Sequence, residues 1–299
     1  MIHILVYELG GNHMYKMICL DLDGTVLNDR KEISKENINL IRRASNEKGI
    51  ICVFATGRPL EYVDEICNSY DDFLTNYIIA SNGAIIRDNK NDEVIYKDSI
   101  TNTQILKLRN IFSEENADYM IVYTDTQQIM REARNIKALK DSAIIVNKKD
   151  SELKYIEDTI KNNPNLSSLL CMIGGDTSVL ENIISRLKEI GGIETPGIGN
   201  YSHKTKNYAF ESKFIDVMKK GCSKKNAIYF LADKLKIKKE EIIVMGDGSN
   251  DLSMFECAGL KIAMENAEEK LKEKADFITA SNNDNGVAKA IQKFVFNEI

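Results

Sequence analysis

Several features that would mark other classes of protein are scarce or missing in this chain of 299 residues. The net charge is −5, and the lysines are mixed with glutamates, so there is no basic stripe to bind a nucleic-acid backbone or an anionic membrane surface. No apolar run approaches the roughly 20 residues that a membrane-spanning helix needs. We therefore expect no partner among nucleic acids or membranes.

The cysteine patterns of metal sites and disulfide frameworks are missing as well. The six cysteines lie far apart, no two form a C-x-x-C pair, and the three histidines are equally scattered. This spacing argues against a zinc site and against disulfide bonds. Small buried thiols are the simpler interpretation, and reduced cysteines favour a cytoplasmic protein. The sequence indicates no particular oligomeric state.

Residues 1–13 need a separate interpretation. Their apolar stretch, residues 2–7, is too short for the hydrophobic region of a secretion signal, and no small-residue cleavage site follows it. One interpretation is a true leading strand. The one that we favour is an upstream extension: translation begins at Met14, and the codons before it include a purine-rich segment that resembles a bacterial ribosome-binding site. The codons of Gly10 and Gly11 decide between the two.

What is present is the composition of an ordinary globular protein, with 43% hydrophobic and 28% charged residues. The length suggests about two domains. Short apolar runs at 17–21, 50–55 and 77–80 predict buried strands. Between the first two, Ser34 is a suitable N-cap and Gly49 a suitable C-cap for a helix. Alternating strands and helices imply an α/β protein with a doubly wound, Rossmann-like parallel sheet.

The pattern changes after Asn82 and returns near Lys213. In between, the sequence predicts a hairpin over 84–96, helices over 101–116, 151–162 and 177–190, strands over 119–123, 144–146 and 169–173, and a glycine-rich polar segment over 191–207. Beyond it, the sequence predicts a helix over 223–235 and strands over 242–245, 260–263 and 276–278. We therefore expect a core domain formed by 14–84 and 209–299, with an α+β domain inserted at 85–208.

Two carboxylates follow the first predicted strand. Asp21 and Asp23, in Asp-Leu-Asp-Gly-Thr, stand at the carboxyl end of that strand, where open α/β sheets bind ligands. A turn at Gly24 can bring both carboxylates to one site, where a cation relieves their repulsion, and Mg²⁺ suits such oxygen ligands. For this motif alone, a strand-end turn that uses Asp and Gly for their backbone preferences is the alternative.

Three further segments carry polar groups at comparable positions. Residues 56–58 (Thr-Gly-Arg) end the second strand with a hydroxyl, a backbone amide and a cation, which suit a phosphate. Lys224 opens a helix, where it could supply a point charge to phosphoryl oxygens, although alone it would be an ordinary surface lysine. After the strand 242–245, Asp247, Asn250 and Asp251 could complete a metal shell.

As an ordered set, these segments resemble the haloacid dehalogenase superfamily of phosphotransferases over nearly the whole chain. Ser81-Asn82-Gly83-Ala84, with residues 263–267 and 285–288, resembles more narrowly its Cof-type branch. Residues 23–56 leave space for one crossover helix only, whereas the insertion after Asn82 stands where this branch has its type C2 cap. Such a cap is expected to close over the site, exclude water and select the substrate.

The resemblance implies a magnesium-dependent phosphatase acting through an aspartyl-phosphate. Its nucleophile would be Asp21, and Asp23 would act as general acid and then as general base. The phosphate-binding residues that it implies are Leu22, Thr56, Gly57, Lys224 and Asn250. The metal ligands that it implies are Asp21, Asp23 through its main-chain carbonyl, Asp247 and, supporting the shell, Asp251. Arg58 and Asn82 are candidates for substrate contact, with a structural role as the alternative.

Lys225 stands where the family usually has glycine, which leaves open which lysine points inward, although the Ser-Lys register favours Lys224. The expected substrate is a small phosphorylated metabolite: a sugar phosphate, a nucleotide-like cofactor or pyridoxal phosphate. One alternative is a phosphosugar mutase or other phosphotransferase that uses the same Asp21. Another is a non-catalytic sensor of phosphometabolites on the same scaffold. The inserted domain would decide the substrate, and it contains no motif that identifies one.

Overall fold

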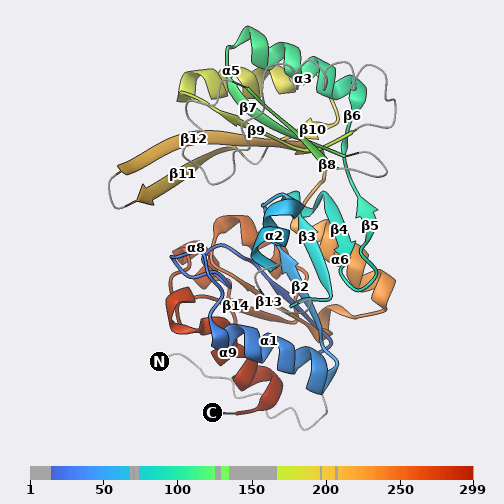
Figure 1. Cartoon of the computed structure of the whole chain (residues 1–299), viewed down its shortest axis with the longest axis vertical. Coiled ribbons are helices and arrows are strands. Elements are labelled where there is room, and N and C mark those ends of the chain that lie inside the picture. The colour runs from blue at the N-terminus through green and yellow to red at the C-terminus, as the bar shows by residue number, and fades with distance from the viewer. Residues whose placement is uncertain are drawn as a thin grey trace.

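The computed structural model describes residues 15–67, 70, 74–124, 129–134, 167–195, 197–205 and 208–298. The upstream extension proposed for residues 1–13 lies outside this part, as do the predicted helix 151–162 and the predicted strand 144–146. In the described part the chain forms two sheets, one above the other in Figure 1. None of the helices described is long and apolar enough to cross a membrane.

The first sheet has eight strands in the order β15-β14-β13-β1-β2-β3-β4-β5. Its strands are β1 (Met17–Leu20), β2 (Ile51–Ala55), β3 (Tyr77–Ala80), β4 (Ile85–Asp88), β5 (Glu93–Lys97), β13 (Ile242–Gly246), β14 (Leu260–Ala263) and β15 (Phe277–Ile278). The helices that accompany it are α1 (Lys35–Lys48), α2 (Leu60–Cys67), α6 (Lys224–Leu235), α7 (Leu252–Phe255), α8 (Glu269–Lys272) and α9 (Gly286–Ile291), with a π-helical turn at Gln292–Phe296.

Strand β1 lies in the middle of the parallel part of this sheet. It pairs with β13, Met17 opposite Ile242, and with β2, Met17 opposite Ile51. Since the strands are parallel and short, their carboxyl ends meet at one edge. The α/β, Rossmann-like core predicted from the strand–helix alternation is confirmed, and this edge is where the polar segments of the sequence come together.

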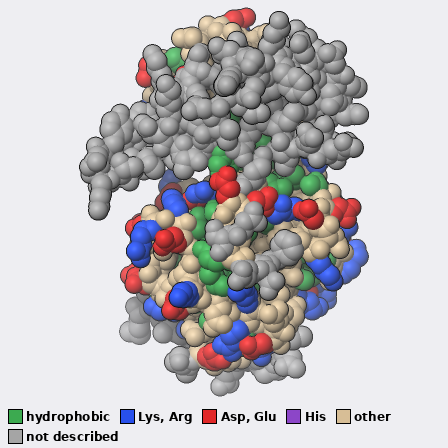
Figure 2. All heavy atoms as spheres, viewed as in Figure 1, with side chains coloured by type: hydrophobic (Ala, Val, Ile, Leu, Met, Phe, Trp, Pro, Cys, Tyr) green, Lys and Arg blue, Asp and Glu red, His purple; other side chains and the backbone are tan. Residues whose placement is uncertain are grey.

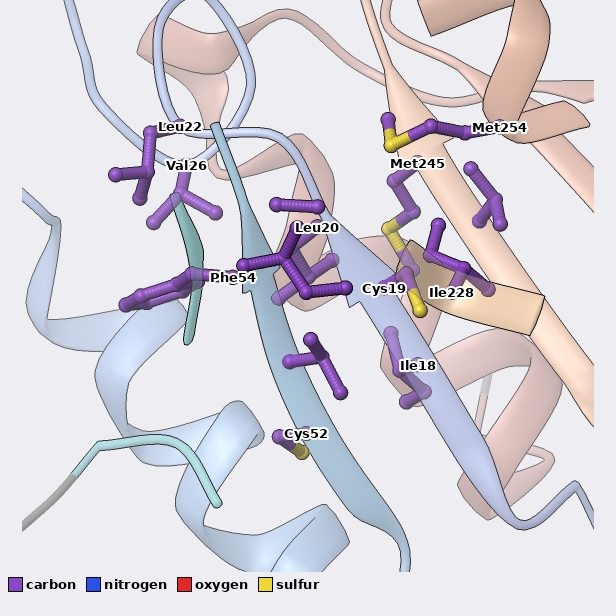
Figure 3. Packing of buried hydrophobic residues seen from close by; sticks show 14 of the residues in the cluster. Ile18, Cys19, Leu20, Leu22, Val26, Cys52, Phe54, Ile228, Met245 and Met254 are labelled. Atoms are coloured by element: carbon purple, nitrogen blue, oxygen red, sulfur yellow. The ribbon is translucent and has the colours of Figure 1, made fainter. Parts of the chain in front are cut away.

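The core of this unit is apolar because each of its central strands is covered on both faces. All four residues of β1 are fully buried, and they pack with Phe54, Met245 and Ile228 of α6. Figure 3 shows Ile18, Cys19 and Leu20 of β1 close to Phe54, Met245 and Ile228. Helix α1 begins and ends as predicted: the Ser34 side chain accepts a hydrogen bond from the amide of Asn37, and Gly49 has a left-handed conformation.

The hairpin β4–β5 differs from its predicted place. The strands were expected inside the inserted domain, but β4 pairs antiparallel with β3, Tyr77 opposite Asp88, and thereby extends the core sheet. The second sheet therefore begins at Ile100 and ends at Lys219, rather than spanning 85–208. The sequence showed the hairpin but not its partner, because strand pairing is set by tertiary contacts that local periodicity does not contain.

The second sheet is antiparallel, in the order β10-β12-β9-β7-β8, with β11 beside β12 and β6 beside β9. Its strands are β6 (Ile100–Thr101), β7 (Asp118–Thr124), β8 (Ile129–Arg134), β9 (Ser167–Gly174), β10 (Ile193–Glu194), β11 (Ile198–Thr205) and β12 (Tyr208–Lys219). Helices α3 (Asn102–Glu114) and α5 (Thr177–Leu187) cover the face that lies away from the core in Figure 1. The opposite face of this sheet is therefore directed toward the core.

Strands β11 and β12 were not predicted: the first lies within the glycine-rich polar segment 191–207, and the second begins directly after it. They form a long hairpin with Ile198 opposite Ile215, which projects to one side in Figure 1. Over the core unit, acidic and basic side chains are interspersed in the view of Figure 2, as the near balance of 40 basic and 45 acidic residues predicts.

Candidate active site

Asp21 follows β1 directly and continues its hydrogen bonding, since its amide donates to the carbonyl of Met245 on β13 (3.1 Å). Its carboxylate is almost fully buried, with 5% of the residue exposed. The ammonium Nζ of Lys224 donates to Asp21 Oδ1 (2.6 Å) and to Asp251 Oδ1 (2.8 Å). Lys224 thus points inward, as the Ser-Lys register favoured, whereas Lys225 pairs with Glu256 at the surface (3.0 Å).

Asp247 and Asp251 come from the turn after β13. The hydroxyl of Thr25 donates to Asp247 Oδ1 (3.0 Å). The second oxygen of Asp251, Oδ2, accepts from the amides of Asp247 (3.1 Å) and Gly248 (3.2 Å), which folds the turn around this carboxylate. Asp21, Asp247 and Asp251 each place one oxygen within 4.8 Å of the others.

Burial and mutual repulsion dominate the electrostatics of this acidic cluster, which we define as Asp21, Asp247 and Asp251. Burial, and then the charge of Asp251, raise the pKa of Asp21 well above its ordinary value, although Lys224 opposes them. The same two causes raise the pKa of Asp247 to about 7. Burial alone would lower the pKa of Lys224, but Asp21 and Asp251 outweigh it and raise that pKa.

These residues fit a hard divalent cation. With all three carboxylates ionised and one ammonium, two negative charges would remain inside a largely buried cluster, and a divalent cation would compensate both. All the donor atoms of the three acids are oxygens, the ligand type that Mg²⁺ prefers. Burial and the charge of Asp251, which raise the pKa values of Asp21 and Asp247, make the fully ionised cluster unfavourable unless a cation is bound.

Asp23 lies outside this cluster and has its own cations. Arg58 binds it in a two-pronged ion pair, Nε to Oδ2 (2.6 Å) and a second guanidinium nitrogen to Oδ1 (2.7 Å). Lys31 Nζ donates to the same Oδ1 (2.8 Å). Burial acts to raise the pKa of Asp23, but hydrogen bonds and charge from the two cations outweigh it and lower the pKa to about 2. Sequence reasoning missed Lys31, and no motif marked it.

The turn between the two aspartates and Thr25 requires glycine at position 24. Gly24 has φ +75°, in the left-handed region. A Cβ at this position would also lie 2.1 Å from Asp247 Oδ2. The absence of a side chain therefore lets the segment after β1 approach the segment after β13, two parts of the chain that are distant in sequence.

The segment after β2 places a hydroxyl and a guanidinium at the same edge. Thr56 is 1% exposed, and its hydroxyl oxygen accepts a hydrogen bond from the amide of Arg58 (3.1 Å). Gly57 runs beside the side chain of Asn82. Leu22 is different, since its side chain belongs to the apolar core, as Figure 3 shows, and only its main chain is available to a ligand.

Asn82 belongs to a strained turn after β3, where Ser81, Asn82 and Gly83 all have positive φ. A Cβ on Gly83 would lie 2.3 Å from the carbonyl oxygen of Ser223, so this turn packs directly against the start of α6, where Lys224 is. The amide nitrogen Nδ2 of Asn82 donates to Oδ2 of Asp216 on β12 (3.1 Å). This hydrogen bond joins the first sheet to the second.

A cavity of about 510 Å³ lies between the two units. Lys224, Asn250 and Asn82 line it from the core, and residues of β10 to β12 line it from the second sheet, with Asp216 and Glu194 carrying charge. Volumes of this order hold small-molecule ligands. Sequence reasoning identified the core side of the cavity but neither of these two carboxylates, because no strand was expected around Asp216.

Comparison with known proteins agrees with this geometry. The sequence model of the haloacid dehalogenase-like hydrolase family matches residues 18–291 of this chain. The chain belongs to this family. It is 31% identical to the phosphatase YwpJ of Bacillus subtilis, over 91% of this chain and 97% of that protein. It is 30% identical to the 5-amino-6-(5-phospho-D-ribitylamino)uracil phosphatase YwtE of the same organism, over 94% of this chain and 98% of that protein.

A solved structure of TM0651 from Thermotoga maritima has the same fold, with a TM-score of 0.74 and 28% identity over 94% of this chain and 98% of that one. Together with the family match, these relatives show that this member of the haloacid dehalogenase-like hydrolases is an enzyme of the phosphatase class, as the resemblance of its motifs implied. Lys224 lines the cavity and also contacts Asp21, so the cavity adjoins the candidate active site at the edge of the first sheet.

Proposed function

We propose that the enzyme hydrolyses a small phosphate ester in two steps, through an aspartyl-phosphate on Asp21. Lys224 binds one oxygen of the Asp21 carboxylate, and the other attacks the phosphorus atom. A bond from Asp21 to phosphorus forms while the bond from phosphorus to the leaving alcohol breaks. Water then attacks the aspartyl-phosphate, which releases inorganic phosphate and regenerates the carboxylate.

Asp23 is the proposed proton carrier of both steps. As an acid it would protonate the leaving alcohol, and as a base it would take a proton from the attacking water. Thr56, Lys224, Asn250 and the main chain of Leu22 and Gly57 would bind the phosphoryl oxygens. Lys224 and Thr56 are buried at this edge, and both side chains can donate hydrogen bonds to an anion.

Mg²⁺ is the proposed cofactor. Asp21, Asp247, the main-chain carbonyl of Asp23 and, in support, Asp251 would hold it. When bound, it would supply positive charge that stabilises the transferring phosphoryl group. The observation that carries this proposal is the acidic cluster itself: a buried nucleophile candidate bound to one lysine, with two negative charges left over.

The second unit, Ile100 to Lys219, is the proposed cap. The sheet face opposite α3 and α5 is directed toward the active-site edge, and its strands complete the cavity in which the leaving group would lie. The named relative acts on a phosphorylated ribityl chain, which makes phosphorylated polyols the first compounds to screen, ahead of nucleotide-like cofactors and pyridoxal phosphate. We also propose that the enzyme works in the cytoplasm, because all six cysteines are free thiols.

The test is phosphate release by the purified enzyme from a panel of phosphate esters, with Mg²⁺ and with EDTA. We expect release with Mg²⁺ only, and none from Asp21→Asn, which keeps the size of the side chain. Acid quenching during turnover should trap phosphate on the wild-type chain and not on the variant. Mg²⁺-dependent turnover by Asp21→Asn at the wild-type rate would contradict the assignment of the nucleophile. Product analysis separates hydrolysis from transfer to a second alcohol.

A further inference from the structure

The cavity wall contributed by β12 has a carboxylate where an apolar residue would be expected. Along this strand Ile215 and Val217 are fully buried in the cluster beneath α3 and α5, whereas Phe214, Asp216 and Met218 line the cavity. The alternation has the period of two that a strand requires. Asp216 is therefore placed by the strand itself at the centre of the cavity face, between two apolar side chains.

Only one of the two carboxylate oxygens of Asp216 has a hydrogen-bond partner among the described residues. Oδ2 accepts the hydrogen bond from Asn82, whereas Oδ1 is shielded from solvent and has no hydrogen-bond partner among the described residues. A buried acceptor without a donor is unfavourable in a folded protein and calls for an explanation. Burial raises the pKa of Asp216 to about 6 while Asn82 opposes this, so the group is mostly ionised at neutral pH.

The two ends of the cavity differ in charge. At the core end, the ammonium of Lys224 is already paired with two carboxylates. At the cap end, the charged groups are Asp216 and Glu194, and Glu194 also accepts from the amide of Gly221 (2.8 Å). Among the described residues that line the cavity, no cation lies at this end. A ligand there can donate hydrogen bonds to carboxylates but meets repulsion if it is an anion.

We propose that Asp216 is a specificity-determining residue that accepts a hydrogen bond from a hydroxyl or amino group of the leaving alcohol and, with Glu194, rejects alcohols that carry a second anion. This inference rests on the proposed function, because it assigns the leaving group to the cap end of the same cavity. The substrate class that follows is the phosphate monoester of a neutral or cationic polyol or amino alcohol, with the apolar faces of Phe214 and Met218 against its carbon atoms.

Glycerol 3-phosphate and 3-phosphoglycerate make a suitable pair of probes, since they share a three-carbon skeleton and differ by a hydroxymethyl group against a carboxylate. We expect the wild-type enzyme to have the higher kcat/KM for glycerol 3-phosphate. Asp216→Asn should lower this preference about tenfold or more, because a site that binds a hydroxyl discriminates strongly through that hydrogen bond. The preference should fall partly because kcat/KM for 3-phosphoglycerate rises.

Asp216→Asn separates this role from a structural one. The asparagine oxygen can still accept from Asn82, so the contact between the sheets is kept while the charge and the second acceptor are lost. If Asp216 only joined the sheets, kcat/KM for both esters would stay or fall together. The control is Glu181→Gln, which removes an exposed carboxylate on α5 of the same unit and should keep the wild-type preference.

Each failure has its own signature. An unchanged ratio in Asp216→Asn, a wild-type preference for 3-phosphoglycerate, or no turnover of glycerol 3-phosphate by an enzyme that hydrolyses an aryl phosphate would overturn the inference and leave the proposed function standing. No Mg²⁺-dependent phosphate release from any of these esters by the wild-type enzyme would overturn both.

Discussion

Replacing Asp247 by asparagine measures what the charge of the acidic cluster costs the folded protein. The substitution keeps the size of the side chain, which matters because Gly24 packs against it, and it keeps an oxygen to accept from Thr25. What it removes is an ionisable group whose pKa is raised from 3.8 in a free chain to about 7 in the folded protein.

The sign follows from proton binding. Between pH 4 and 7 the unfolded chain has lost the proton of Asp247, whereas the folded protein without metal still holds it. The free energy of unfolding therefore falls as the pH rises through this window, by at most about 1.4 kcal/mol per pH unit, or about 4 kcal/mol in all. We expect about half of this, roughly 2 kcal/mol, because Asp247 is partly exposed and water screens its charge.

Urea unfolding in EDTA at pH 4 and at pH 8 tests this magnitude. At pH 4, close to the ordinary pKa of Asp247, wild type and Asp247→Asn should unfold at similar urea concentrations, and at pH 8 the variant should be the more stable by about 2 kcal/mol. Mg²⁺ at pH 8 should reverse the order, because it binds folded wild type far better than the variant. Asp233→Asn, which removes an exposed carboxylate with 86% of its side chain accessible, should follow wild type throughout. A metal-free Asp247→Asn that is no more stable than metal-free wild type at pH 8 would refute the reasoning.

Two further substitutions probe the same edge of the sheet, each with a matched control. Gly24→Ala should abolish phosphatase activity and lower the free energy of unfolding by about 2 kcal/mol or more, because φ is +75° and the new Cβ would meet the carboxylate of Asp247. Gly49→Ala is the control, since Gly49 has a similar φ of +66° but open space around it. This variant should lose about 1 kcal/mol of stability and retain activity. Lys224→Met should destabilise the metal-free protein by about 3–5 kcal/mol, because it leaves the two buried carboxylates of Asp21 and Asp251 without their cation. Lys225→Met is the control: it removes a surface ion pair and should change the stability by less than about 1 kcal/mol. Chemical denaturation and phosphate release measure both, and equal effects of the two lysine variants would contradict the assignment of the inward lysine.

The core side of the site could be predicted from the sequence because each part is marked locally. Asp21, Thr56 and Asp247 each follow a short apolar run, and a run of four or five apolar residues identifies a buried strand with little ambiguity when turn residues flank it. Parallel pairing then brings their ends together without any further information. Lys224 was recognised only as a member of this ordered set.

The cap side could not be predicted, for a physical reason. Strand β12 begins in a segment rich in lysine, serine and aromatic residues, and the carboxylate of Asp216 interrupts its apolar pattern. That carboxylate has a favourable partner only through Asn82, 134 residues earlier in the chain. The contact between Lys31 and Asp23 could not be predicted either, because it depends on a turn in which Lys31 has φ +63°. Polar residues placed for contact with a ligand depart from the apolar alternation by which strands are predicted from sequence.

The pKa of Asp21 is raised and that of Asp23 is lowered, and this difference constrains the order of proton transfers in the proposed mechanism. Asp23, held by Arg58 and Lys31, has a pKa of about 2 and is a carboxylate at neutral pH, so in this arrangement it can accept a proton but has none to give. That state suits the second step, in which water loses a proton. The first step needs a protonated Asp23, and its pKa rises if Arg58 and Lys31 turn to another anion. The phosphate of an arriving substrate is such an anion, so Asp23 would take up a proton from solvent when substrate binds, whereas in the empty site it stays a carboxylate.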